Sequence, residues 1–390
     1  LYYYDQAGNL VQTVPPEGVN PVDDSDFMDG VWNGTEPEHD TTLITRYQYN
    51  SAEQIVHQRT PEAGRTEFHY DRAQRLRFSQ NARQSPGSDY AYTKYDAQSR
   101  IIEVGQLENY PLTASDIADQ SFPTSSETLT DVVRTTYDET TPPSGVPSEN
   151  TRGRVAKVEN DHVATYYDYD AHGNVRELTH ILPQLQDSVV SVAYTYDADN
   201  RIQRVFTSDD GYVFDEDARY FYYLHGPLAR VELGEDKVQG MDYFYTLQGW
   251  IKGVNMSGGM ASEDQGLDGH IDSTNVHRYF GRDTMTYTLG YHASDYDPIG
   301  SLSLSSAIAN SWTGFSSDIL ESQSTEGLFN GNISQMLTDN GMGLQGMAYQ
   351  YDALHRIRQG RSYDWSSSWS ASNDFDVDMR YDANGHLDSL

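Results

Sequence analysis

One short pattern recurs along this 390-residue chain, and it constrains the fold more than any other feature. In residues 194–202 two tyrosines stand two positions apart, so their side chains point to the same face of a strand. Asp197 and Asn200 flank a run of turn formers, because their short polar side chains can bond the local backbone. Arg201 and Ile202 then begin a returning strand. The pattern predicts a β-hairpin, and its recurrence predicts a fold built from hairpins.

The same pattern returns at short intervals. Its other copies begin with Tyr4-Asp5, Tyr70-Asp71, Tyr95-Asp96, Tyr169-Asp170, Tyr351-Asp352 and Tyr381-Asp382, and a divergent copy begins with Tyr49-Asn50. Arg356 closes one of these turns as Arg201 closes the turn after Tyr196-Asp197. Gly8, Gly173 and Gly385 stand inside three others, where a tight turn needs a positive φ. A short, fairly even period is typical of a repeat architecture.

The Tyr-Asp-x-x-Gly-Arg-aliphatic pattern resembles the YD repeat of the RHS family, and the resemblance extends over the whole chain. Residues 223–233, 243–254 and 329–333 are also similar to passages of that family. RHS relatives close a long sheet into a hollow shell. The resemblance therefore implies an all-β fold, in which YD-repeat hairpins form a long spiralling antiparallel sheet that is part of a cocoon-like shell.

This fold predicts one continuous shell segment over residues 1–390. Hairpins are expected near residues 2–14, 47–60, 68–80, 92–107, 166–182, 194–206, 220–233, 243–254, 349–361 and 379–390. Residues 15–42, 108–150, 255–276 and 301–328 lack the repeat and are expected as loops or insertions at the rims of the sheet. Short helices are expected at 112–119, capped by Thr113 or Ser115, and near 317–322.

Composition agrees with a thin sheet and restricts the partners. The chain has 30 tyrosines against 12 phenylalanines. Tyrosine suits a sheet that is partly exposed to solvent, because its ring packs while its hydroxyl forms a hydrogen bond. The net charge of -33 opposes binding to nucleic acid or anionic lipid. There is no cysteine and no apolar run of the roughly 18–20 residues that a membrane span needs. The chain begins at Leu1 in a strand-like stretch, so we expect it to be part of a longer polypeptide.

The repeated side chains have a functional and a structural interpretation. The aspartates would supply catalytic carboxylates, but a catalytic residue should be unique, and turn formation explains their recurrence. The tyrosines would form a stacking platform for sugars or bases, but same-face aromatics on adjacent hairpins more often pack the sheet itself. No nucleophile elbow, phosphate loop, dinucleotide fingerprint or His-Glu-x-x-His sequence occurs. We therefore expect no catalytic, cofactor-binding or metal-binding residue here.

Three other stretches approach known patterns. Asp264, Asp268 and Asp272 approach a calcium loop, but Asn275 stands where a bidentate Glu is needed. Residues 374–378 alternate aspartate with apolar residues, which predicts a strand with one acidic face. Residues 297–300 match the Asp-Pro-x-Gly start of the RHS self-cleavage element, but the Asn-x-Tyr-x-Tyr part is missing. We interpret that match as a coincidence.

By resemblance, the expected function is a structural shell segment of a secreted protein that encloses a C-terminal toxin or effector for delivery. The implied partners are the rest of the same polypeptide, the enclosed effector and a secretion apparatus, and the implied location is outside the cell or at its surface. The alternative is a surface adhesin or carbohydrate-binding repeat protein. Its sugar-stacking residues would be Trp250, Trp312, Trp365 and Trp369. A third hypothesis is a glycan-cleaving enzyme with a carboxylate pair.

Overall fold

Almost all regular structure in the chain is antiparallel β-sheet, as the alternating sequence pattern predicts. The computed structural model describes residues 1–19, 27–28, 31–32, 40–185, 188–255, 266–269, 274–292, 295, 328–341, 343–366 and 368–389. The chain divides into two compact units, which are described separately. Unit 1 comprises Leu1–Val190 and Asp382–His386, and unit 2 comprises Ser191–Tyr381 and Leu387–Leu390.

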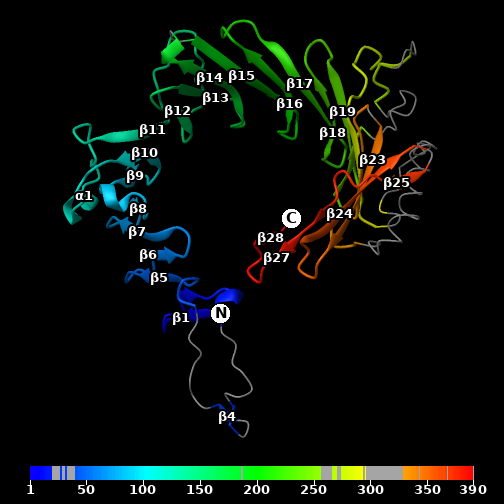
Figure 1. The fold of residues 1–390 in the computed structure, drawn as a ribbon. Helices are drawn as coiled ribbons and strands as arrows, with labels where there is room; N and C mark the ends of the chain where they lie inside the picture. The colour runs from blue at the N-terminus through cyan, green and yellow to red at the C-terminus, as the bar shows by residue number, and fades with distance from the viewer. Residues whose placement is uncertain are drawn as a thin grey trace. The chain divides into compact units, whose positions relative to one another are not determined.

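Unit 1 is a succession of hairpins in which each strand pairs with the next along the chain (Figure 1). Its strands are β1 (Tyr2–Tyr4), β2 (Leu10–Thr13), β5 (Thr45–Tyr49), β6 (Ile55–Thr60), β7 (Gly64–Tyr70), β8 (Leu76–Gln80), β9 (Tyr90–Tyr95), β10 (Ile101–Leu107), β11 (Leu129–Tyr137), β12 (Val155–Glu159), β13 (Ala164–Tyr169) and β14 (Val175–Leu182). Between β2 and β5, the short strands β3 (Phe27–Met28) and β4 (Val31–Trp32) pair with each other. Three 3-10 turns are η1 (Pro16–Gly18), η3 (Ser85–Gly87) and η4 (Pro183–Leu185).

Unit 2 continues the same plan. Its strands are β15 (Ser188–Tyr196, which starts at the unit boundary), β16 (Ile202–Ser208), β17 (Asp215–Tyr222), β18 (Leu228–Leu233), β19 (Gln239–Tyr245), β20 (Ile251–Val254), β21 (Thr286–Gly290), β22 (Gln335–Asp339), β23 (Leu344–Tyr351), β24 (Ile357–Trp365), β25 (Trp369–Ala371), β26 (Val377–Asp378), β27 (Arg380–Tyr381) and β28 (Leu387–Ser389). Consecutive strands from β15 to β25 pair, β24 also pairs with β26, and β27 pairs with β28. Among the described strands, 24 are assigned to one antiparallel sheet, which confirms the predicted fold class.

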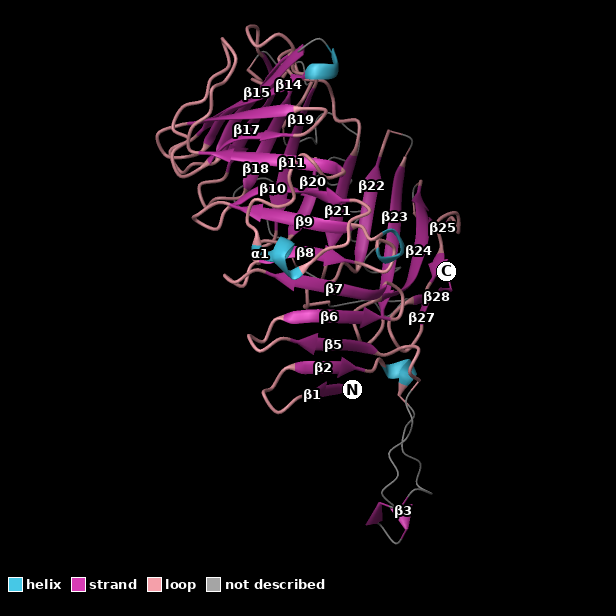
Figure 2. Cartoon of the chain, turned by 90° about the vertical axis from the view of Figure 1, so that its left-hand side faces the viewer, coloured by secondary structure: helices cyan, strands magenta, loops and turns pink. Residues whose placement is uncertain are grey.

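An insertion in unit 1 packs on the sheet instead of extending beyond it. The predicted helix is present as α1 (Ala114–Ala118), and Thr113 caps it: its hydroxyl accepts the Asp116 N–H while the Asp116 carboxylate accepts the Thr113 N–H. The helix lies beside β8 and β9 in both views (Figures 1 and 2). Phe122 from the same insertion joins Phe78, Tyr92 and Leu107 in a buried cluster. The range predicted as a rim insertion thus supplies a second layer over part of the sheet.

Unit 2 has a smaller apolar cluster under its last long hairpin. Leu337, Ala348 and Tyr363 are buried together, and Trp369 packs against them. The strand predicted over residues 374–378 is wrong in extent, because only the two residues of β26 are extended. Asp376 instead accepts the backbone N–H of Ser362, 14 residues earlier in the chain, at 2.7 Å. Within the described residues, no helix has the length and apolar character to cross a membrane.

Candidate functional site

The Tyr-Asp turns share one hydrogen-bond scheme, which the turn after Tyr70 illustrates. One oxygen of Asp71 accepts the backbone N–H groups of Ala73 and Arg75 at 2.8 and 2.9 Å. The other accepts the Arg75 guanidinium Nε at 2.9 Å. The backbone of Asp71 closes the loop by donating to the Arg75 carbonyl. Gln74, the last residue before Arg75, adopts a φ of 63°, so the turn passes through the left-handed region.

The scheme recurs with small variations. The carboxylates of Asp96, Asp197 and Asp352 bind the guanidinium Nε of Arg100, Arg201 and Arg356 at 2.6, 2.8 and 2.7 Å, while Asp5 and Asp170 bind Asn9 and Asn174, and Asp382 binds His386. In the divergent copy the amide oxygen of Asn50 accepts the N–H groups of Ala52 and Gln54. The turn therefore needs a short acceptor at this position, and a carboxylate adds an ion pair.

These contacts favour the ionised aspartate. The backbone N–H and guanidinium of Arg201 lower the pKa of Asp197. Burial acts to raise the pKa of Asp71, but the hydrogen bonds and charge of Arg75 lower it by more. A carboxylate that accepts several N–H groups is stabilised in its charged form. The aspartates are thus fixed acceptors, which is the opposite of a carboxyl tuned to exchange a proton near neutral pH.

Tyrosines of most motifs, and two further tyrosines at equivalent strand ends, form a link to the previous hairpin. Tyr70 pairs with Leu76 across its own turn, beside an irregularity in the register. Its hydroxyl donates to the carbonyl of Ile55, which is the first residue after the preceding turn, at 2.9 Å. The part of the chain that the structure describes contains at least eight such links, which join Tyr49 to Leu10, Tyr70 to Ile55, Tyr95 to Leu76, Tyr169 to Val155, Tyr222 to Ile202, Tyr291 to Ile251, Tyr351 to Ile333 and Tyr381 to Ile357, all at 2.7–2.9 Å. Tyr4, in the first hairpin, is exposed.

The arginine that closes a turn reaches the next tyrosine ring. The guanidinium of Arg75 lies 4.7 Å from the centre of the Tyr95 ring, and Arg201 lies 4.4 Å from that of Tyr222. Arg100 over Tyr137, Arg154 over Tyr169 and Arg356 over Tyr381 repeat the contact. Such a cation–π contact contributes about 0.5–1 kcal/mol at an exposed site. Ring and hydroxyl of one tyrosine therefore both contact the preceding repeat.

Buried cations hold the insertions in place, and sequence reasoning did not single them out. In unit 1, Arg77 is fully buried and donates to the carbonyl oxygens of Thr93, Asp119 and Phe122. This guanidinium therefore ties the end of the α1 insertion to strand β9. The only sequence signal was an arginine between two apolar residues of a predicted strand, Leu76 and Phe78.

Unit 2 contains two buried ion pairs that anchor the segment after β20. Arg230 donates to Asp242 at 2.5 Å and to Asp268 at 2.7 Å. Lys252 donates to Asp295 at 2.7 Å, and both side chains are almost completely buried. Arg230 and Lys252 lie in residues 223–233 and 243–254, two of the three passages for which the sequence predicts a similarity to the RHS family outside the turns. Removing one partner of such a pair leaves a buried charge without compensation, which costs about 3–5 kcal/mol.

One of these ion pairs involves the stretch that approaches a calcium-loop pattern in the sequence. Asp268 is buried against the Arg230 guanidinium, so a cation of the protein already occupies the position of a metal ion. Asn275 donates to the Leu267 carbonyl at 2.6 Å. Asp264 and Asp272 lie outside the described residues, as do residues 297–300 and 317–322. Among the residues that the structure places, no group of three or more His, Asp or Glu side chains is arranged to hold a metal.

Three of the tryptophans pack against the protein's own rings at a tilted angle. Trp365 and Trp369 have ring centres 5.2 Å apart, and Trp250 lies 5.0 Å from Tyr291. All are half-buried. Trp312 lies outside the described residues. In this structure the indole faces of Trp250, Trp365 and Trp369 are therefore at least partly used for packing.

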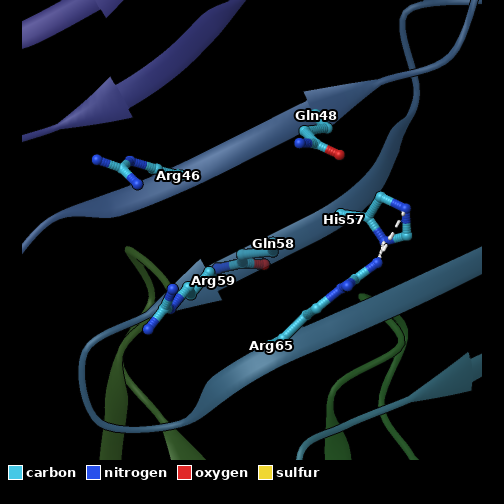
Figure 3. Close-up of a pocket in the computed structure, with 6 residues that line it drawn as sticks. All are labelled: Arg46, Gln48, His57, Gln58, Arg59 and Arg65. Carbon is cyan, nitrogen blue, oxygen red and sulfur yellow. Dashed lines mark hydrogen bonds between the residues drawn. The ribbon is translucent and has the colours of Figure 1, made fainter.

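Strands β5, β6 and β7 bear a pocket of about 410 Å³ (Figure 3). It is lined by Arg46, Gln48, His57, Gln58, Arg59 and Arg65. Arg65 lies 3.2 Å from Nδ1 of His57 and 2.8 Å from the Glu67 carboxylate. Its lining includes three arginines in a strongly acidic chain, and the sequence pattern did not reveal it.

Successive hairpins, bulged tyrosine pairs and links between neighbouring turns define a YD-repeat sheet. The same fold occurs in the crystal structure of TcdB2-TccC3-TEV, with 13% identity, 99% of this chain and 15% of that chain covered, and a TM-score of 0.53. The crystal structure of TcdB2-TccC3 without its hypervariable C-terminal region matches with 14% identity, 99% and 17% coverage, and a TM-score of 0.50. These matches confirm the resemblance to the RHS/YD-repeat family at the level of the fold.

Sequence comparison adds one relative. Salivary gland surface protein 1 of Aedes aegypti is 24% identical over 264 residues, which are 64% of this chain and 7% of that protein. No family model matches the chain. The chain therefore spans only a small part of the length of each of these relatives.

Proposed function

We propose that this chain is a structural shell segment of a secreted RHS-repeat protein that encloses a C-terminal toxin or effector. The single observation that supports this most is the chain of tyrosine links, since it devotes the repeated residues to holding hairpin to hairpin. The match to toxin-complex structures over 99% of the chain agrees with it. The residues that recur, namely the Tyr, Asp and Arg of the signature, would then be structural, and any activity would belong to another part of the polypeptide.

The side-chain composition of the sheet suits a container. A sheet rich in tyrosine and aspartate offers weak polar contacts and not one deep apolar pocket. A net charge of -33 also discourages binding to nucleic acid or to an anionic membrane. The partners would be the rest of the same polypeptide and its enclosed effector, with a secretion apparatus as a further one. The location would be outside the producing cell or on its surface.

The test is protection of the enclosed segment from protease. The full-length protein that contains this chain is treated with a nonspecific protease, and the survival of its C-terminal part is followed with time. Survival should depend on the links: Tyr70→Ala combined with Tyr95→Ala should expose the C-terminal part, whereas Tyr212→Ala, at an exposed tyrosine, should not. Digestion of the C-terminal part while the unmodified sheet remains intact would overturn the proposal.

A surface adhesin is the second candidate, because the mosquito relative is a salivary gland surface protein. Sugar binding would then use aromatic faces near Trp365 and Trp369. Binding of the 390-residue chain to an array of glycans, reduced by Trp365→Ala and not by Tyr212→Ala, would favour it. An array without any specific signal would leave the container proposal as the better one.

A further inference from the structure

Three arginines form a row across adjacent strands on one face of unit 1. Arg46 on β5 is directly opposite Arg59 on β6, and Arg59 is directly opposite Arg65 on β7. Directly opposed residues in an antiparallel sheet have Cα atoms about 4.5–5.5 Å apart and side chains on the same face. All three side chains are exposed, and Figure 3 shows them beside the same pocket. We call Arg46, Arg59 and Arg65 the arginine row.

The charge of the row is poorly neutralised by the protein. Arg65 pairs with Glu67 at 2.8 Å, and Arg46 donates only to the neutral amide oxygen of Gln12. In the part of the chain that the structure describes, Arg59 makes no ion pair. His57, directly opposite Glu67, adds a further titratable group to the same face. One carboxylate thus faces three guanidinium groups, in a chain with 59 acidic and 26 basic residues.

Such a row is unfavourable unless something binds to it. Like charges directly opposite each other destabilise a sheet, and two such pairs share Arg59. Elsewhere on unit 1 the arginines at cross-strand positions have acids nearby, as Arg134 has Glu103 at 2.8 Å. The acids needed for a similar arrangement are abundant in this sequence, yet the row has only Glu67. A cost of this kind is typical of a binding site.

We propose that the arginine row binds a small ligand that bears two or more phosphate or sulfate groups. Guanidinium groups bind these oxyanions by paired hydrogen bonds, and a tetrahedral oxyanion has enough acceptor oxygens to serve two neighbours at once. The arginine row offers two positions between neighbouring guanidinium groups, one between Arg46 and Arg59 and one between Arg59 and Arg65. One anionic group at each position would be held by two arginines, so Arg59 would contact both groups.

The size and charge of the surroundings exclude a long polyanion. Three arginines provide about three phosphate contacts, fewer than the 6–10 that give a protein firm hold of nucleic acid. The overall negative charge repels a long polymer more than a small ligand. The residues that line the pocket come from three adjacent strands, which suits a short molecule lying across them. This inference is independent of the container proposal.

Inorganic tripolyphosphate is the first probe, measured by calorimetry on the 390-residue chain at low salt. It should bind more tightly than inorganic monophosphate. Arg59→Gln should weaken it about tenfold or more, as expected for the loss of charge-assisted hydrogen bonds. Arg83→Gln removes the same charge from an exposed loop of unit 1 and should change the affinity by less than about twofold. A disulfated disaccharide and its unsulfated form, as further probes, separate a sulfated sugar from a phosphate ligand.

The variant Glu67→Gln is expected to bind the probe more tightly, and misfolding of a variant could not produce a gain in affinity. It removes the one acid that neutralises Arg65, so it should raise the affinity for tripolyphosphate several-fold. Thermal unfolding of each variant shows that it is folded. Absence of binding, equal affinity for monophosphate and tripolyphosphate, or equal effects of Arg59→Gln and Arg83→Gln would each overturn the proposal.

Discussion

The hydroxyl of Tyr351, the last residue of β23, donates to the carbonyl oxygen of Ile333, just before β22, at 2.8 Å. Tyr351→Phe keeps the ring and leaves that carbonyl without its donor. We expect the variant to lose about 1–2 kcal/mol of the free energy of unfolding, measured by urea denaturation. Tyr212→Phe, at a side chain that is 81% exposed, should lose almost nothing. Equal losses would show that the link does not stabilise the sheet.

The same residue predicts how stability depends on alkaline pH. Burial, with a smaller effect of Tyr349, raises the pKa of Tyr351 to about 12. An unfolded tyrosine ionises near pH 10, so the folded state favours the neutral phenol. The contribution is complete below about pH 10 and is lost as pH rises from about 10 to 12. The stability difference between the natural chain and Tyr351→Phe should shrink over that range, and a constant difference would contradict the prediction.

Asp71→Asn tests the turn. The amide retains the backbone acceptor but loses the ion pair with Arg75, so the loss should be about 1–2 kcal/mol near neutral pH. Because the folded state lowers the pKa of Asp71, its contribution is present above the unfolded value near 3.8 and is lost as pH falls further. The difference between the two proteins should therefore decrease in acid. Asp161→Asn, at an exposed residue of the same unit, is the control.

Arg77→Met tests the hydrogen bonds by which the buried Arg77 side chain holds the α1 insertion on the sheet. The substitution leaves three carbonyl oxygens without their donor, so a loss of about 3 kcal/mol or more is expected in the unfolding of unit 1. Arg77→Lys should recover only a small part, because one ammonium group cannot reproduce the forked guanidinium. Arg83→Met provides the matched exposed change. If Arg77→Lys were as stable as the natural chain, charge alone and not geometry would explain how this side chain holds the insertion.

Arg59→Gln should stabilise the ligand-free protein. It removes the charge shared by two like-charged cross-strand pairs, so the midpoint of thermal unfolding should rise at low salt by an amount equivalent to about 0.2–1 kcal/mol. Added salt screens the repulsion and should reduce the difference. Arg83→Gln should not shift the midpoint upward. A lower midpoint for Arg59→Gln would mean that the arginine stabilises the sheet.

The local part of this structure could be predicted from the sequence, because the turn is made by residues four positions apart. The spacing from Asp197 to Arg201 is enough to specify the acceptor, the closing N–H and the ion pair. The cap of α1 is equally local, and the structure selects Thr113 from the two caps that were predicted, Thr113 and Ser115. The strand over residues 374–378 was wrong because Asp376 serves as an acceptor for Ser362, which is distant in sequence.

The tyrosine links and the contacts of the buried cations could not be predicted, because they depend on the register between hairpins. Nothing in the sequence near Tyr70 indicates that its hydroxyl donates to the carbonyl oxygen of Ile55. Arg77 and Arg230 were missed for a different reason: a charged residue in an alternating strand is normally read as solvent-facing. Both are buried because an insertion covers them, and the position of an insertion over a sheet is a tertiary property.

The eight tyrosine links all point the same way, from a later hairpin to an earlier one. In each of these links, the residue that supplies the carbonyl acceptor is therefore synthesised before the tyrosine that donates to it. Each newly made hairpin completes the one behind it, while the newest always has an acceptor still open. Assembly of the sheet can thus keep pace with synthesis, one repeat behind the growing end.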